Sequence, residues 1–101
     1  MNKYTELSDF EINKKVFIEL YGEESLKDKD MLGVFNRSDY CDNPADAMPI
    51  IIENKIGLSP MYHSNKWTAD CLDYDFMSVN KNPYRGAMEV FLMMKDTENN
   101  Q

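Results

Sequence analysis

The residues best suited to carry chemistry in this sequence are two cysteines and a single histidine. Cys41, Cys71 and His63 lack the paired spacing, such as Cys-x-x-Cys, that structural zinc sites use. A hairpin would allow a nucleophile–base pair between Cys71 and His63, but no acid is placed to orient the histidine. We therefore expect two small, half-buried thiols and a surface histidine, with no catalytic residues assigned.

Two groups of aspartates offer oxygen ligands for a hard cation such as Mg²⁺. One group is Asp39, Asp42 and Asp46, and the other is Asp70, Asp73 and Asp75. Such a cation needs ligands that converge on one point, and neither group has an EF-hand loop or another known ligand pattern. We expect helix caps and solvated turns here, and no metal site. No phosphate-binding glycine motif is present either, so no cofactor is expected.

Composition narrows the class of protein further. The chain has 101 residues, which suits a single domain, and a net charge of -7. An acidic surface repels phosphate, so direct binding to nucleic acid is disfavoured. No apolar run is long enough to span a membrane, and the N-terminus has no signal-peptide core. We expect a cytoplasmic protein with free thiols.

The first element that positions these residues is a helix beginning after Ser8. Ser8 and Glu11 have the spacing of a capping box, and Leu7 and Ile12 that of a hydrophobic staple. One side of the helix is apolar and Gly22 ends it; the apolar residues are Ile12, Val16, Phe17 and Leu20. After it we expect a polar, mobile loop over 23–30 and a short edge strand over 31–35.

The stretch from Asp39 to Gly57 is predicted to be the central helix on which the rest of the chain packs. Asn43 is a good N-cap, Pro44 suits the first helical position, and Asp46 meets the positive end of the helix dipole. Gly57 is expected to stop the helix, with Leu58 packing back on a buried Ile52.

Pro49 conflicts with a continuous central helix, because it removes the hydrogen bond to the Ala45 carbonyl. One alternative is a turn over 44–47 followed by a new helix starting near Pro49. A strand over 50–52 is a second alternative, although the polar residues 53–55 favour a helix.

Strands are predicted in the region after the central helix. A short strand starts at Gly57, with Pro60 restricting it to a sheet edge. Residues 66–72 partly alternate and form the best strand candidate, so 58–62 and 66–72 would make a hairpin. Residues 76–79 form either one more short strand or a loop.

The last helix is predicted over 84–95, capped by Asn82 and Pro83 and followed by a frayed polar tail over 96–101. Its apolar residues, with Met88, Met93 and Met94 among them, cover most of its circumference, which is typical of a buried helix. Only Arg85 and Glu89 form a polar strip.

Arg85 falls at the third helical position, where a cation faces the positive end of the dipole. We infer that Arg85 has a structural partner, and the candidates are Asp42, Asp46 and Asp75. In the alternative, Arg85 points outward and binds an anionic partner.

Three blocks of the chain resemble the NinX-like proteins of lambdoid bacteriophages and their prophage relatives. They are residues 4–14, 39–56 and 82–94, about half of the chain, whereas 23–38 and 59–81 match poorly. The second and third blocks also resemble, more loosely, small phage α/β/α-sandwich domains. The resemblance implies a phage accessory protein in the host cytosol and carries over no catalytic residues.

These patterns together predict an α+β domain with three helices and a short antiparallel sheet of two to four strands. For function we expect a non-enzymatic module that binds a host or phage protein. One alternative is an acidic mimic of nucleic acid that inhibits a DNA-binding protein. A second is a small enzyme or metal-dependent hydrolase.

Overall fold

The computed structural model describes residues 2–73 and 75–99. Its α+β architecture agrees with the predicted class, with a three-stranded antiparallel sheet and one more α-helix than expected. In chain order the elements are α1 (Asp9–Tyr21), the 3₁₀-helix η1 (Glu23–Lys27), α2 (Lys29–Arg37), α3 (Pro44–Glu53), β1 (Gly57–Pro60), β2 (Trp67–Asp70), β3 (Met77–Asn80) and α4 (Pro83–Asn99).

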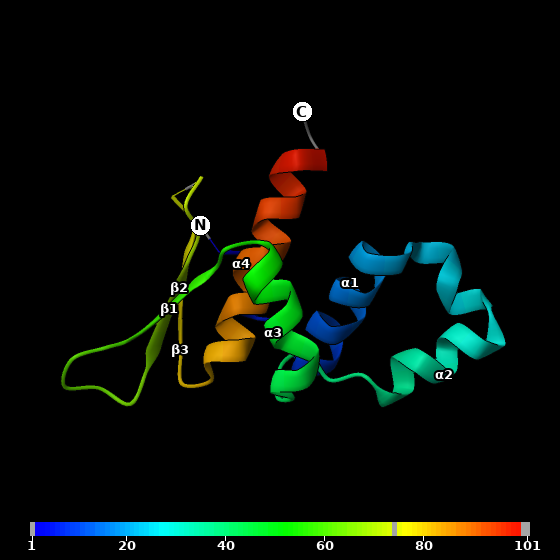
Figure 1. The fold of residues 1–101 in the computed structure, drawn as a ribbon, viewed down its shortest axis with the longest axis horizontal. Helices are drawn as coiled ribbons and strands as arrows, with labels where there is room; N and C mark the ends of the chain where they lie inside the picture. The colour runs from blue at the N-terminus through cyan, green and yellow to red at the C-terminus, as the bar shows by residue number, and fades with distance from the viewer. Residues whose placement is uncertain (1, 74, 100–101) are drawn as a thin grey trace.

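The helix on which the other elements pack is α4, not the central helix α3. Every residue of α4 from Arg85 to Met94 is buried, including the three methionines predicted to be core. Figure 1 shows α4 between the sheet on one side and α1 and α3 on the other. A helix that is apolar on most of its faces is stable only when neighbours cover those faces, which explains its central place.

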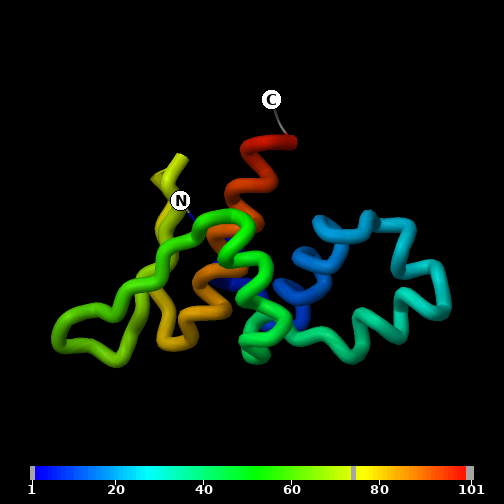
Figure 2. Tube along the Cα trace, viewed as in Figure 1, coloured from blue at the N-terminus to red at the C-terminus, as the bar shows by residue number. Residues whose placement is uncertain are grey.

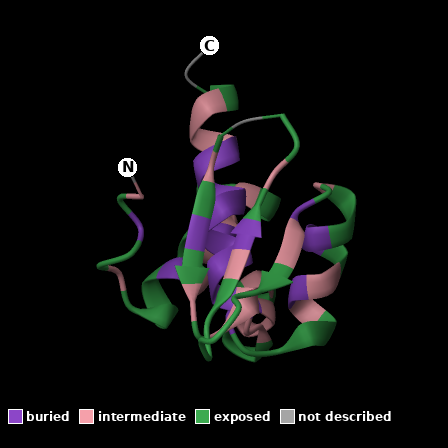
Figure 3. Ribbon diagram, turned by 90° about the vertical axis from the view of Figure 1, so that its left-hand side faces the viewer, coloured by how far each residue is buried: buried purple, intermediate pink, exposed green. Residues whose placement is uncertain are grey.

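The sheet has the order β1-β2-β3, and both pairings are antiparallel. The predicted hairpin is present, with Leu58 opposite Ala69, and Pro60 lies on an edge strand as expected. Ala69 and Ser78 are buried and lie near Gly86 of α4, whereas Met77 and Val79 are exposed. Figure 3 shows buried parts of the strands in purple. All the described helices lie on one side of the sheet in Figure 1, with α4 next to the sheet and α1 and α3 beyond it, so the fold is not an α/β/α sandwich.

Gly86 lies where α4 packs against β2 and β3. A Cβ atom at this position would lie 3.7 Å from the Cβ atoms of Ala69 and Asn80 and 3.8 Å from Ser78 Oγ. These are ordinary van der Waals distances, so a methyl group would fit at this position, and the strands pack on α4 at normal contact distance.

The start of α1 follows the sequence prediction. Ser8 is its N-cap, and the Ser8 and Glu11 side chains form the reciprocal capping box. Ile12, Val16 and Phe17 are buried, whereas Leu20 at the end of the same stripe is 40% exposed. Gly22 ends the helix with a positive φ of 91°, a backbone conformation that glycine adopts without strain because it has no side chain.

The predictions of a loop over 23–30 and a strand over 31–35 are wrong. Residues 23–27 form η1, and Asp28 then caps α2 by accepting from the backbone amides of Asp30 and Met31. Figure 2 shows this segment projecting away from the rest of the fold. Phe35 is the one buried residue of α2, and its ring contacts the rings of Phe10 and Phe17 at centroid distances of 5.7 and 5.3 Å.

The helix α3 is continuous through Pro49, so neither the restart near Pro49 nor the strand over 50–52 occurs. A proline inside a helix costs about 3 kcal/mol. The C-cap of α3 is Asn54, and the positive φ of 54° falls at Lys55. Gly57, where the end of the helix was expected, instead begins β1. Ile50 and Ile51 are buried but Ile52 is exposed, so the predicted core position of Ile52 is wrong.

The predicted frayed tail is wrong for residues 96–99, which form the last turn of α4. Asp96 accepts a hydrogen bond from the Tyr4 hydroxyl and pairs with Lys3, which holds this turn against the N-terminal segment. Residues 100 and 101, the rest of that predicted tail, lie outside the described residues.

Candidate functional site

The polar strip formed by Arg85 and Glu89 is buried and faces the interior of the protein. Arg85 Nε donates to Glu89 Oε2 at 2.7 Å, and Nη1 donates to Asp9 Oδ1 at 2.7 Å. Nη2 donates to the carbonyl oxygens of Tyr4 at 2.9 Å and Leu7 at 2.7 Å. The guanidinium therefore joins α4 to the N-terminal segment and to the start of α1.

Arg85 is structural, as inferred, but Asp42, Asp46 and Asp75 are not its partners. Burial lowers the pKa of the guanidinium, yet the hydrogen bonds to Asp9 and Glu89 outweigh it and raise the pKa above its ordinary value. The other oxygen of Glu89 accepts from Asn2 at 2.6 Å and from Ser78 at 2.7 Å. The buried members of this network are paired with one another, so we assign it the structural role of holding these elements together.

The first aspartate group caps and ties the segment before α3. Asp46 Oδ2 accepts from the Asp39 amide at 2.9 Å, and Asp39 Oδ1 accepts from the Asp42 amide at 3.2 Å. Asp42 Oδ1 accepts from Asn82 Nδ2 at 2.7 Å, and burial together with the nearby charge of Asp39 raises the pKa of Asp42. These carboxylates accept hydrogen bonds in the turn before α3 and from Asn82, whereas the N-cap of α3 is Asn43.

Cysteine and histidine are placed far apart. Cys41 is fully buried, and desolvation raises the pKa of its thiol to about 12, so it is a poor nucleophile. His63 lies in the exposed turn between β1 and β2, whereas Cys71 follows the opposite end of β2. The imagined pair of Cys71 and His63 is therefore not formed. Within 2–73 and 75–99, no three His, Cys, Asp or Glu side chains are grouped so as to hold a metal ion.

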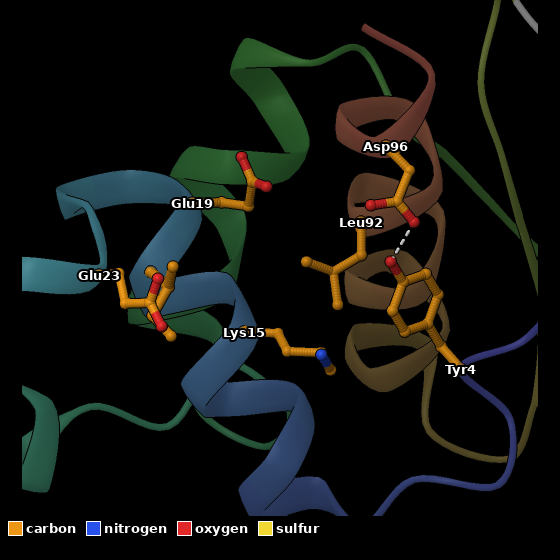
Figure 4. Close-up of a pocket in the computed structure, with 7 residues that line it drawn as sticks. Tyr4, Lys15, Glu19, Glu23, Leu92 and Asp96 are labelled. Atoms are coloured by element: carbon orange, nitrogen blue, oxygen red, sulfur yellow. Dashed lines mark hydrogen bonds between the residues drawn. The ribbon is translucent and has the colours of Figure 1, made fainter. Parts of the chain in front are cut away.

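One hollow lies between the N-terminal segment, α1 and α4 and is drawn in Figure 4. It has a volume of about 250 Å³, and Tyr4 and Asp96 face Lys15 and Glu19 across it. Three of its polar side chains already have partners: the Tyr4 hydroxyl donates to Asp96, and Asn99 at the end of α4 donates to Glu19. Burial and the Asp96 carboxylate raise the pKa of Tyr4, which keeps this hydroxyl protonated.

A second hollow is an open groove between the end of α1, the end of α2 and one side of α3. Its volume is about 370 Å³. The apolar part of its wall comes from all three helices: Leu20, Val34, Ala45, Pro49 and Ile50. Ala45 and Pro49 are exposed and lie on one stripe of α3 with Ile52, which is 68% exposed. The groove thus opens onto an apolar helix face.

The polar groups of this groove are hydroxyls and carboxylates. Tyr21, which is 53% exposed, contributes an aromatic ring at the end of α1, and Tyr40 lies buried in the wall. Burial raises the pKa of Tyr40. Asp46 and Glu53 are the charged lining residues, and among the described residues that line the groove there is no lysine or arginine. We take this groove, together with Ile52 beside it, as the candidate site.

Sequence reasoning did not find this groove, because its wall combines residues from three separate elements. Two signals were present nonetheless. One is Pro49, which removes a hydrogen bond inside a predicted helix. The other is the run Ile50–Ile52, which has one more apolar residue than a half-buried helix needs.

Comparison with known families now adds an independent observation. The family model described as bacteriophage P22 NinX matches residues 3–95 of the chain. The chain belongs to this NinX family. The resemblance seen in three sequence blocks is thereby confirmed, and the match also extends across the strand region that those blocks left out. The comparisons with curated proteins and with solved structures each gave no match.

For this member of the phage NinX family, membership supports the role of a phage accessory protein. Among the described helices, none is both long enough and apolar enough to cross a membrane.

Proposed function

We propose that this phage accessory protein acts by binding another protein through the groove between α1, α2 and α3, without catalysing a reaction. The observation that carries the proposal is the exposed apolar surface formed by the groove wall and Ile52. Exposed apolar side chains that lie together, rimmed by polar groups, commonly mark protein interfaces.

The two other functions receive less support from the described residues. A nucleic-acid mimic needs free carboxylates arrayed on one face. Four carboxylates near the start of α1 and α3 instead accept internal hydrogen bonds: Asp9, Asp39, Asp42 and Asp46. A hydrolase needs an activated nucleophile or a metal cluster; the Cys41 thiol is buried with a raised pKa and donates to the Asp9 carbonyl oxygen, and no metal-binding group of side chains is found among the described residues.

The experiment uses tagged protein to capture partners from phage-infected bacterial cells and then measures direct binding of the purified candidate by calorimetry. The groove variant carries Tyr21→Ser and Ile52→Ser. The matched control carries Tyr62→Ser and Leu72→Ser, which remove exposed apolar side chains outside the groove. We expect wild type and control to bind, and the groove variant to bind at least tenfold more weakly.

Equal binding by the groove variant, or the absence of any protein partner, would overturn the proposal. Binding that duplex DNA displaces, and that does not depend on the groove, would favour the nucleic-acid mimic instead.

A further inference from the structure

The groove has a chemical character that specifies its partner. Resting on the proposed function, we propose that the groove accepts a basic amphipathic segment of the partner protein, which inserts apolar side chains and places lysine or arginine beside Glu53, Asp46 and the Ala45 carbonyl. The argument rests on the charge of the lining, on Pro49 and on the apolar stripe of α3.

The first step concerns charge. The ionised side chains that line the groove, Asp46 and Glu53, are both acidic, and the whole chain carries a net charge of -7. Asp46 Oδ2 accepts from the Asp39 amide, whereas the exposed Glu53 carboxylate makes no hydrogen bond or ion pair with the described residues. A partner with lysine or arginine at the edge of its binding surface is attracted to these carboxylates and associates faster, whereas an acidic partner is repelled.

The second step concerns Pro49. Because proline has no N–H group, the Ala45 carbonyl lacks the donor that an α-helix normally supplies four residues later. Ala45 and Pro49 both line the groove and are exposed, so the interrupted hydrogen bond lies between two groove residues. A lysine or arginine side chain can donate to the carbonyl and pair with a carboxylate at the same time.

The third step concerns stability. Pro49 lowers the stability of α3 because it removes a backbone hydrogen bond. Its side chain is exposed, so packing of the ring compensates little for this loss of stability. Residues that reduce stability without a structural return are concentrated at functional sites. The ring also stiffens the apolar stripe formed by Ala45, Pro49 and Ile52, which reduces the ordering cost of binding.

The direct test uses three synthetic helical peptides of equal length, with fluorescence anisotropy for affinity and amide chemical shifts for location. One peptide has a leucine face flanked by lysines. The second replaces lysine with glutamate, and the third replaces leucine with serine. We expect the lysine–leucine peptide to bind, to shift amides of Tyr21, Ala45 and Glu53, and to weaken as salt rises. Each of the other two should bind at least tenfold more weakly.

Variants of the protein separate specific from general charge effects. Glu53→Lys and Glu6→Lys change the net charge equally, and both residues are exposed. Only Glu53→Lys is expected to weaken binding of the lysine–leucine peptide by at least fivefold. Equal loss in both variants would show attraction by the overall charge alone and would overturn the inference.

Pro49→Ala provides a readout that a purely structural role would not give. Restoring the amide donor should raise Tm by several degrees while weakening the peptide several-fold, because the Ala45 carbonyl is then occupied. Tighter folding with unchanged peptide affinity would contradict the role of the carbonyl.

The outcomes also separate this inference from the proposed function. Groove-dependent capture of a natural partner without preference for the basic peptide would overturn the inference alone. Selective binding of the basic peptide without a groove-dependent natural partner would overturn the proposed function alone.

Discussion

Arg85 Nη1 on α4 lies 2.7 Å from Asp9 Oδ1 at the start of α1, although 76 residues separate the two in the chain. The same guanidinium also binds Glu89 and the carbonyl oxygens of Tyr4 and Leu7. Asp9 lies in the first turn of α1, where a carboxylate is favoured by the helix dipole, and Arg85 holds it there. This contact closes the N-terminal segment onto the core.

Arg85→Lys is expected to destabilise the protein by about 1–3 kcal/mol, since an ammonium group cannot supply the fork of donors that these acceptors need. Urea unfolding measures the change, with the exposed Arg37→Lys as control. Removal of the charge with Arg85→Met should cost about 3–5 kcal/mol, because Glu89 is left buried without its cation. A loss below about 0.5 kcal/mol for both variants would show that the network contributes little.

Ile51→Asp and Ile52→Asp are expected to have opposite outcomes, although the two residues are adjacent. Ile51 is 5% exposed, so a carboxylate there is buried without a partner and should prevent stable folding. Ile52 is 68% exposed, and its substitution should change stability by less than about 1 kcal/mol. Thermal melts followed by circular dichroism distinguish them. A cooperative melt of Ile51→Asp near the wild-type Tm would show that the core is misplaced.

Stability is expected to fall at alkaline pH because of Cys41. Burial raises the pKa of this thiol from 9.0 to about 12, so the folded state resists ionisation that the unfolded state allows. The contribution of the protonated Cys41 thiol to the free energy of unfolding is complete below pH 9. It is lost as the pH rises toward 12, at up to about 1.4 kcal/mol per pH unit.

Urea unfolding between pH 8 and 11 measures this slope, and Cys41→Ala should reduce it. Cys71→Ala is the control, because Cys71 is only half-buried. An identical pH slope in wild type and Cys41→Ala would assign the alkaline loss to other groups, such as the Tyr4 and Tyr40 hydroxyls, whose pKa values burial also raises.

The capping box of α1 is expected to respond to acid. Hydrogen bonds from the Ser8 amide and hydroxyl lower the pKa of Glu11 below 4.5. Its stabilising effect is therefore present above pH 4.5 and is lost as pH falls through the lowered pKa. Amide exchange in the first turn of α1 measures this fraying. Glu11→Gln should remove the acid dependence, and Ser8→Ala should cost about 1 kcal/mol. Persistence of the acid effect in Glu11→Gln would point to other carboxylates.

The sequence by itself determined where three of the helices begin and where the chain turns back as a hairpin. Ser8 with Glu11, Asn43 with Pro44, and Asn82 with Pro83 mark those starts, and the structure has caps at all three. Such signals act between neighbours in the chain, so they can be read without knowing the fold. The same holds for the family, whose blocks contain those starts.

The tertiary structure alone decided the partners of Arg85, the exposure of Ile52 and the existence of the groove. In the run Ile50–Ile52, each residue turns by about 100° around the helix, and packing against α4 selects which two are buried. The position of Arg85 in the first turn of its helix indicates that it needs a partner. Asp9 and the carbonyl oxygens of Tyr4 and Leu7 come close to it only when the N-terminal segment packs against α4. The groove joins Tyr21, Val34 and Pro49 from three helices, and no spacing along the chain encodes that meeting.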